Sequence, residues 1–235
     1  MIKAKRHTTY LPAVRQGDIR HTKKAVILLS GGIDSATTLY IAKNKGFECF
    51  PLVFDYGQRH AKELRCAKAV AKKAGSEPIV MKISLPWMGS SLLDRTLKVP
   101  EKRQKGIPNT YVPGRNIVFM SFALSYAESI KADAIFIGAH SQDYSGYPDC
   151  RKEFFDAFNE MKNKGTKSGK NIKLYTPILH MNKTQIIKCG SKLNVPFAIT
   201  WSCYQGKKKP CLKCDSCYYR MKGFESLGLK DPILC

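Results

Sequence analysis

The chain lacks long apolar runs, and this absence argues against one large class of proteins. Nowhere in its 235 residues does an apolar stretch approach the ~20 residues that a membrane-spanning helix requires. Residues 1–22 are basic and contain no uninterrupted apolar segment of the kind found in secretory signals. We therefore expect a cytoplasmic protein with no membrane segment.

Acidic residues are also scarce. The 18 Asp and Glu residues stand against 40 Lys and Arg residues, which gives a formal net charge of +22. A surplus of this sign attracts anions, either the phosphates of a nucleic acid or a small anionic substrate. The basic residues are spread along the whole chain, and no RNA-binding motif with interleaved aromatic residues is present. The pattern favours a small anionic substrate over direct nucleic-acid binding.

Two common nucleotide-binding motifs are missing, but a different glycine-rich loop is present. There is no GxGxxG, and the near match to a Walker-type loop at residues 165–170 is one residue short. Instead, Ser30-Gly31-Gly32-Ile33-Asp34-Ser35 follows an apolar run. Two glycines let the backbone approach a ligand closely, and the N–H groups of the next helix converge on the same point.

This loop predicts a phosphate site. The hydroxyls of Ser30 and Ser35 would act as donors, while Asp34 would orient the loop or hold Mg²⁺. The structural alternative is a strand–helix turn in which the glycines serve geometry alone. The position between a buried strand and a helix favours the phosphate site.

Apolar segments alternate in a way that predicts an α/β fold. We expect strands over 25–29, 50–54, 78–83 and 134–138, and helices over 35–45, 58–74 and 116–130. Strands that alternate with helices are typical of a doubly wound, Rossmann-like parallel sheet. The sequence thus predicts a basic, mobile arm (1–22), a main domain (23–196) and a small C-terminal module packed on it (197–235).

Long irregular stretches are predicted at 84–115 and 139–149. Both follow strands, at the carboxyl edge of the sheet, where open α/β folds bind ligands. Residues 162–173 are rich in Lys and Gly, and we expect an exposed turn there.

Four of the nine cysteines are clustered near the C-terminus. Cys203 is followed by Cys211-x-x-Cys214-x-x-Cys217, a spacing that brings four thiolates onto one structural zinc ion and leaves no open position for a reacting water. An iron–sulfur cluster is the main alternative, because four cysteines also suit it. Unrelated buried thiols are the second alternative.

Taken together, these motifs resemble the 7-cyano-7-deazaguanine synthases, members of the PP-loop ATP pyrophosphatases with an adenine nucleotide α-hydrolase-like fold. The resemblance covers residues 24–229 and includes SGGIDSAT, FDYGQRH, VPGRN, DYSGYPDCR and WSCY followed by PCxxCxSCxxR. It implies a homodimeric ligase that converts 7-carboxy-7-deazaguanine, free ammonia and ATP to the nitrile in queuosine or archaeosine biosynthesis. The carboxylate attacks the α-phosphorus of ATP, ammonia displaces AMP, and a second activation dehydrates the amide.

The resemblance and the motif positions together assign roles to individual residues. Catalytic roles are predicted for Asp34, Ser35, Arg115 and Lys183. ATP contacts are predicted for Leu29, Ser30, Gly31, Gly32, Ile33, Asp34, Ser35, Ala36, Thr37, Thr38, Leu39, Val53, Asp55 and Arg59. Substrate contacts are predicted for Tyr56, Gln58, Asn116, Asp143, Tyr144, Tyr147 and Asp149. The metal ligands are Cys203, Cys211, Cys214 and Cys217, and Mg²⁺ accompanies ATP.

Structural readings compete with several of these roles. Arg59 and Lys183 also fit solvated surface charges, Asn116 fits a helix cap, and Tyr147 and Asp149 fit turn chemistry. Two other functions fit parts of the pattern. A PP-loop enzyme that thiolates or otherwise modifies tRNA would use the high positive charge, whereas the DYSGYPDCR segment disfavours it. A zinc-dependent nucleic-acid-binding module with an inactive loop is disfavoured because the loop is intact.

Overall fold

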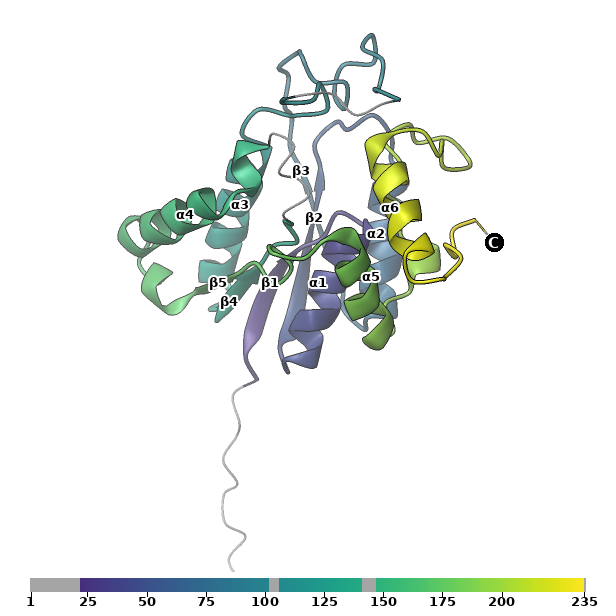
Figure 1. Cartoon of the computed structure of the whole chain (residues 1–235). Coiled ribbons are helices and arrows are strands. Elements are labelled where there is room, and N and C mark those ends of the chain that lie inside the picture. Colours follow the sequence, from purple (N-terminus) through teal and green to yellow (C-terminus); the bar gives the residue numbers. More distant parts are fainter. Residues whose placement is uncertain (1–21, 102–105, 141–146, 235) are drawn as a thin grey trace, which may run out of the picture.

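A parallel sheet of five strands forms the centre of the molecule (Figure 1). The computed structural model describes residues 22–101, 106–140 and 147–234. The strands are β1 (Lys24–Leu28), β2 (Glu48–Asp55), β3 (Ile79–Lys82), β4 (Ala134–Phe136) and β5 (Lys173–Tyr175). Their order in the sheet is β3-β2-β1-β4-β5, and every pairing is parallel. From β1 the chain first adds β2 and β3 on one side of the sheet and then adds β4 and β5 on the other, as in a doubly wound fold.

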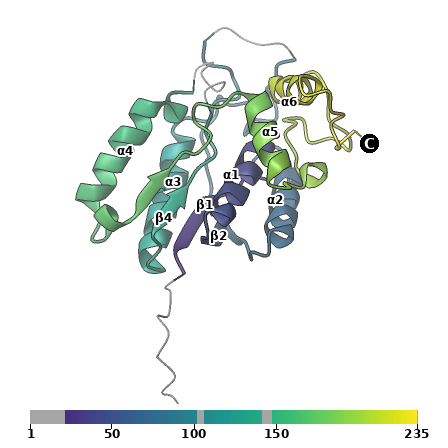
Figure 2. The same ribbon diagram turned by 60° about the horizontal axis from the view of Figure 1, so that its bottom comes forward.

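Helices cover both faces of this sheet (Figures 1 and 2). One layer contains α1 (Ile33–Asn44), α2 (Lys62–Lys73) and α5 (Lys183–Lys192), with α6 (Asp215–Glu225) packed on α5. The other contains α3 (Arg115–Ser129) and α4 (Lys152–Gly165). Three short 3₁₀ helices span Pro148–Cys150, Gly169–Asn171 and Phe197–Ile199. None of the described helices is both long and apolar enough to cross a membrane.

The central strand shows why its sequence is continuously apolar. Ala25 and Ile27 of β1 point into the core under α1 and α2, whereas Val26 and Leu28 point into the core under α3. Successive side chains of a strand point to opposite faces, so a strand covered on both faces needs an apolar residue at every position. This confirms the expected fold class, and the predicted strands and helices agree with the structure apart from small shifts of their ends.

The expected exposed turn at 162–173 is right for its middle, where Lys167, Lys170 and Asn171 are exposed, and wrong at both ends. Residues 162–165 form the last turn of α4, and Lys173 begins β5. The side chain of Lys162 is buried, and its Nζ donates to the carbonyl of Gly169 and to Oδ1 of Asn163 at 2.8 and 2.7 Å. The Lys- and Gly-rich composition hid a helix end because a lysine can be buried when its ammonium is fully hydrogen-bonded.

The C-terminal segment shares its packing with the sheet domain. Phe197 and Phe224 join the core formed by α1, α2 and α5. The guanidinium of Arg220 is buried and donates to both carboxylate oxygens of Asp231, at 2.6 and 2.9 Å, and to the carbonyl of Phe197. A domain boundary at 196/197 stays a prediction, and the predicted arm lies outside the described residues apart from Thr22.

Candidate active site

The glycine-rich loop closes on itself through its two serines. The helix α1 begins at Ile33, earlier than predicted, so Ser35 lies in its first turn. Oγ of Ser35 accepts from the N–H of Ser30, donates to the carbonyl of Gly32 and lies 3.0 Å from Oγ of Ser30. In the described structure no side chain caps α1. Its first N–H groups and positive end therefore face the carboxyl edge of the sheet, where they can bind an anion.

Gly31 allows α2 to approach this loop unusually closely. Its φ is +86°, and a Cβ at this position would lie 2.6 Å from the backbone N of Ala67 and from the carbonyl O of Glu63. Both obstacles are backbone atoms of α2, so they cannot swing aside. Glycine is therefore required here for its conformation and for its lack of a side chain.

Gly31→Ala should lower the free energy of unfolding by about 1–3 kcal/mol, because it combines a strained φ with a backbone clash. It should also weaken ATP binding, since α2 and the loop must separate. Gly46→Ala is the matched control: its φ is +81°, but nothing lies within 4 Å of the added Cβ. Denaturant unfolding and calorimetric titration with ATP measure both effects. Equal losses in the two variants would contradict the role of close packing.

Asp34 is the centre of a partly buried polar cluster. Nζ of Lys183 donates to Oδ1 and Oδ2 of Asp34 at 2.7 and 2.8 Å, and it also lies 3.0 Å from Nε2 of His140. Burial opposes the charge of Asp34, but the neighbouring Lys183 and His140 outweigh it and hold the pKa of Asp34 well below its usual value. The carboxylate is thus permanently charged, and its partners fix it at the start of α1.

A cavity of about 250 Å³ opens beside the loop. One side, which we call the nucleotide side, is formed by the carboxyl ends of β1, β2 and β4 and by the loop. Its lining includes Leu29, Ser30, Gly32, Asp34, Ser35 and Val53. These six residues were among the predicted ATP contacts. The lining on this side thus comes from the ends of β1 and β2 and from the start of α1.

The opposite side of the cavity, the substrate side, lies at the start of α3. Tyr56, Gln58, Arg115, Asn116 and Tyr147 line it, and all were predicted site residues. Nη1 of Arg115 donates to the hydroxyl of Tyr56 at 3.3 Å. Burial lowers the pKa of Arg115, but Tyr56, Asp149 and Cys150 outweigh that and raise it above its usual value. A permanent cation therefore faces a cavity of mixed polar and aromatic character.

Arg59 and Gln58, two of the predicted contact residues, make hydrogen bonds to the protein backbone in this structure. The guanidinium of Arg59 lines the cavity, but it donates to the carbonyls of Ser91 and Leu97 at 2.9 and 2.8 Å and so orders the loop after β3. The side chain of Gln58 accepts from the N–H of Tyr56 and donates to the carbonyl of Phe54. Their predicted contacts with ATP and substrate stay predictions.

Asp149 caps α3 from outside the helix. Its Oδ2 accepts from the N–H of Asn116 at 3.0 Å, and its carbonyl accepts from Nδ2 of Asn116 at 3.1 Å. A carboxylate at a helix N-terminus satisfies free N–H groups and is favoured by the helix dipole. Asp149 does not line the cavity, so in this structure it positions Asn116 and the neighbouring Arg115.

Other predicted residues lie behind the cavity wall or outside the described structure. Lys183 contacts Asp34 and not the cavity. The remaining predicted ATP contacts that do not line the cavity are Gly31, Ile33, Ala36, Thr37, Thr38, Leu39 and Asp55. Asp143 and Tyr144 lie outside the described residues.

Sequence reasoning missed several residues of the cavity. Among them are Glu63, Thr110, Phe119, Cys150 and Trp201. Thr110 Oγ1 lies 2.6 Å from the hydroxyl of Tyr147, which fixes that ring. Burial raises the pKa of Glu63 to about 7, while Arg115 opposes the rise and Cys203 adds to it. The motifs containing Cys150 and Trp201 pointed to the region, but nothing in the helical pattern of α2 marked Glu63.

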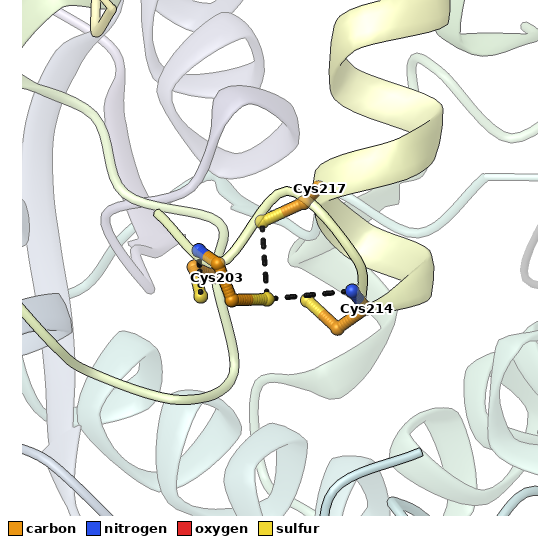
Figure 3. Close-up of side chains that lie close together, drawn as sticks. Cys203, Cys214 and Cys217 are labelled. Carbon is orange, nitrogen blue, oxygen red and sulfur yellow. Dashed lines mark hydrogen bonds between the residues drawn. The ribbon is translucent and has the colours of Figure 1, made fainter. Parts of the chain in front are cut away.

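The four predicted metal ligands lie together. Their sulfur atoms all fall within 4.8 Å of one another, and Figure 3 shows Cys203, Cys214 and Cys217 turned toward a common point. One ion bonded to four sulfurs at about 2.3 Å would place the sulfurs about 3.8 Å apart. The sulfurs of Cys211 and Cys217 are 3.9 Å apart. A multi-iron cluster binds its cysteines through different iron atoms and holds them farther apart, so the geometry fits a single ion.

This cysteine site is joined to the phosphate loop by a short segment of chain. The N–H of Trp201 donates to the carbonyl of Gly31 at 2.8 Å, two residues before Cys203. Nε2 of His60 lies 3.1 Å from the carbonyl of Cys203, and Nζ of Lys62 lies 3.6 Å from the centre of the Trp201 ring. The metal site and the anion site therefore share their supporting residues.

Comparison with known proteins identifies the family. The family described as "Queuosine biosynthesis protein QueC" matches residues 24–228. The chain belongs to this family. The match covers both the phosphate loop and the four cysteines.

Relatives in this family are similar over nearly their whole length. A 7-cyano-7-deazaguanine synthase of Thermoplasma volcanium is 46% identical over 90% of this chain and 90% of its own. Those of Nostoc punctiforme and Acetivibrio thermocellus are 48% and 49% identical over 90% of this chain and 99% and 97% of theirs. A solved NMN synthetase of Francisella tularensis has a TM-score of 0.49 at 15% identity, over 89% of this chain and 78% of that one. That likeness is too distant to bear on the reaction.

Proposed function

We propose that this chain converts 7-carboxy-7-deazaguanine, ammonia and ATP to 7-cyano-7-deazaguanine. The carboxylate attacks the α-phosphorus of ATP and releases pyrophosphate, ammonia displaces AMP to give the amide, and a second activation dehydrates the amide to the nitrile. The single observation that carries the proposal is the cavity itself. In it, an uncapped helix start at the Ser30–Ser35 loop faces a second wall built from Tyr56, Arg115 and Tyr147.

The two walls support the two parts of the chemistry. On the nucleotide side, the N–H groups at the start of α1 would hold the pyrophosphate, and the backbone at Val53 would lie along the adenine. On the substrate side, Arg115 would neutralise the substrate carboxylate, and Tyr147 would stack on or donate to the deazapurine. Positioning of the reactants and neutralisation of charge at phosphorus can supply most of the rate, so a strong acid–base residue is not needed for the first step.

The proposed function involves two metal ions, one at the four cysteines and one with ATP. We infer that the four cysteines hold zinc, which would supply structural stabilisation and no reaction chemistry. The pKa of Cys203 is held well below its usual range by the thiols of Cys214 and Cys217, so a thiolate is already favoured at one ligand position. Mg²⁺ would accompany ATP and be held chiefly by the phosphates, because Lys183 occupies both oxygens of Asp34. A homodimer in the cytoplasm, using free ammonia, completes the proposal.

Release of pyrophosphate tests the function directly. We expect release only when ATP and 7-carboxy-7-deazaguanine are both present, with amide and then nitrile formed once an ammonium salt is added. A coupled pyrophosphate assay and mass spectrometry of the deazapurine measure the two stages. If turnover instead required tRNA and ignored the free deazapurine, the chain would be a tRNA-modifying enzyme. If neither tRNA nor the free deazapurine led to pyrophosphate release, the result would favour a non-enzymatic nucleic-acid-binding module.

A further inference from the structure

Two carboxylates line the cavity, and only one of them has a strong cationic partner. Asp34 is held by Lys183, as described above. Glu63 has no lysine or arginine within 4.0 Å among the described residues, and its nearest basic group is Nε2 of His60, 4.0 Å from Oε1. The side chain of Glu63 is only 23% exposed. A carboxylate that is largely removed from water and has no permanently charged cation beside it is unfavourable unless a cation joins it.

Glu63 lies close to both the phosphate loop and the substrate side of the cavity. It occupies the first turn of α2, and its backbone carbonyl is one of the atoms that packs against Gly31 of the phosphate loop. Its carboxylate interacts electrostatically with Tyr56 and Arg115 of the substrate side. Both the phosphate loop and the substrate-side cation therefore lie near Glu63, in the cavity where the proposed reaction brings the substrate carboxylate to the α-phosphorus.

We propose that Glu63 binds the ammonium ion that supplies the nitrogen of the amide and takes a proton from it before the nitrogen attacks. The inference rests on the proposed function. At neutral pH, ammonia in water is almost entirely ammonium, which is a cation and has no lone pair. A site must attract this cation and also remove one proton before a C–N bond can form. A cavity carboxylate that no lysine or arginine holds can meet both needs.

Ammonium gives one proton to the Glu63 carboxylate and becomes ammonia, whose lone pair forms the bond to the acyl carbon of the adenylate. The bond from that carbon to the adenylate oxygen breaks, and AMP leaves with its electron pair. A second proton leaves the nitrogen for solvent, which yields the neutral amide. Glu63 then returns its proton to solvent and is ready for the next turnover.

The surroundings of Glu63 favour ammonium over Mg²⁺. The cavity's other carboxylate is already bound by Lys183, so Mg²⁺ would find one carboxylate and would require ordered oxygen ligands in an octahedron. Aromatic rings and oxygen acceptors suit a monovalent ammonium better, through cation–π contact and through hydrogen bonds that the ammonium donates. The groups that act on Glu63 from the elements around it are His60, Tyr56, Arg115, Cys203 and, on its own helix, Cys66. A pKa of about 7 suits a group that must exchange protons near neutral pH.

Steady-state kinetics of Glu63→Gln test this assignment. The variant keeps the shape of the side chain and removes its charge and basicity. We expect kcat/KM for ammonium to fall by about 10²-fold, within the range that general-base catalysis supplies, while KM for ATP changes little. Glu63→Asp should recover part of the loss. Glu77→Gln, an identical substitution at an exposed position, is the control.

First-turnover pyrophosphate release without ammonium separates the possible outcomes. If wild type releases no pyrophosphate with the deazapurine acid, the proposed function fails. If wild type does and Glu63→Gln shows an unchanged kcat/KM for ammonium, only the inference about Glu63 fails. A shift in the Mg²⁺ dependence of that release would make Glu63 a metal ligand and would also overturn it. Metal content and thermal unfolding establish that each variant is folded.

Discussion

Asp34→Ala should reduce substrate-dependent pyrophosphate release by about 10²–10³-fold or more, the loss expected when a preorganised electrostatic group is removed. In the wild-type structure, the carboxylate of Asp34 takes both hydrogen bonds from Lys183 at the base of the cavity. Without it, a buried ammonium loses its counter-ion, and the first turn of α1 loses the partner that fixes it. A pyrophosphate assay under saturating ATP and deazapurine acid measures the effect.

The four-cysteine site gives this experiment its internal control. The metal content of Asp34→Ala should stay at about one ion per chain, because the cysteine ligands are untouched. Asp156→Ala provides a matched substitution, since Asp156 is exposed on α4 and pairs only with Lys152 in the described structure. Full activity in Asp34→Ala would exclude a catalytic role for Asp34. Loss of metal together with activity would show instead that the substitution disrupts the fold.

The fold was largely predictable from the order of apolar segments. The part of β1 after Lys24 is apolar at every position because both faces of the strand are covered, and that pattern is visible in the sequence. The region after residue 150 was harder, because α4 carries Lys and Glu on its exposed face and β5 is only three residues long. Its Lys162 is also buried through hydrogen bonds that composition cannot reveal.

The candidate site was predictable where chemistry depends on local spacing. The phosphate loop and the cysteine cluster are short motifs whose function follows from adjacent residues. Positions that depend on contacts far apart in the sequence were not predictable. The bonds from Arg59 to the carbonyls of Ser91 and Leu97, and from Asn116 to Asp149, exist only once the chain is folded.

Glu63 illustrates the same limit. Its neighbours in the sequence describe an ordinary amphipathic helix start, and only the packing of α2 on Gly31 places it at the cavity.

Cys214→Ser should lower the bound metal from about one ion per chain to a small fraction, because a four-thiolate site loses one of its ligands. Metal binding by such sites contributes about 10 kcal/mol or more in small zinc peptides, so thermal stability and soluble yield should fall together. The substitution removes a fully buried sulfur that also lies at the N-cap of α6. Elemental analysis by mass spectrometry and thermal unfolding of the purified chain measure both losses.

The same variant should also bind ATP more weakly, although no cysteine of the cluster belongs to the phosphate loop. The connection is the segment 201–203: its N–H at Trp201 donates to Gly31, while Cys203 is a metal ligand and its carbonyl contacts His60. When the ligand set loses its ion, this segment loses one of its attachments, and the loop loses a support. Cys189→Ser on α5, outside the cluster, should leave metal, stability and ATP affinity close to wild type. Metal loss with unchanged ATP affinity would show that the two sites are independent.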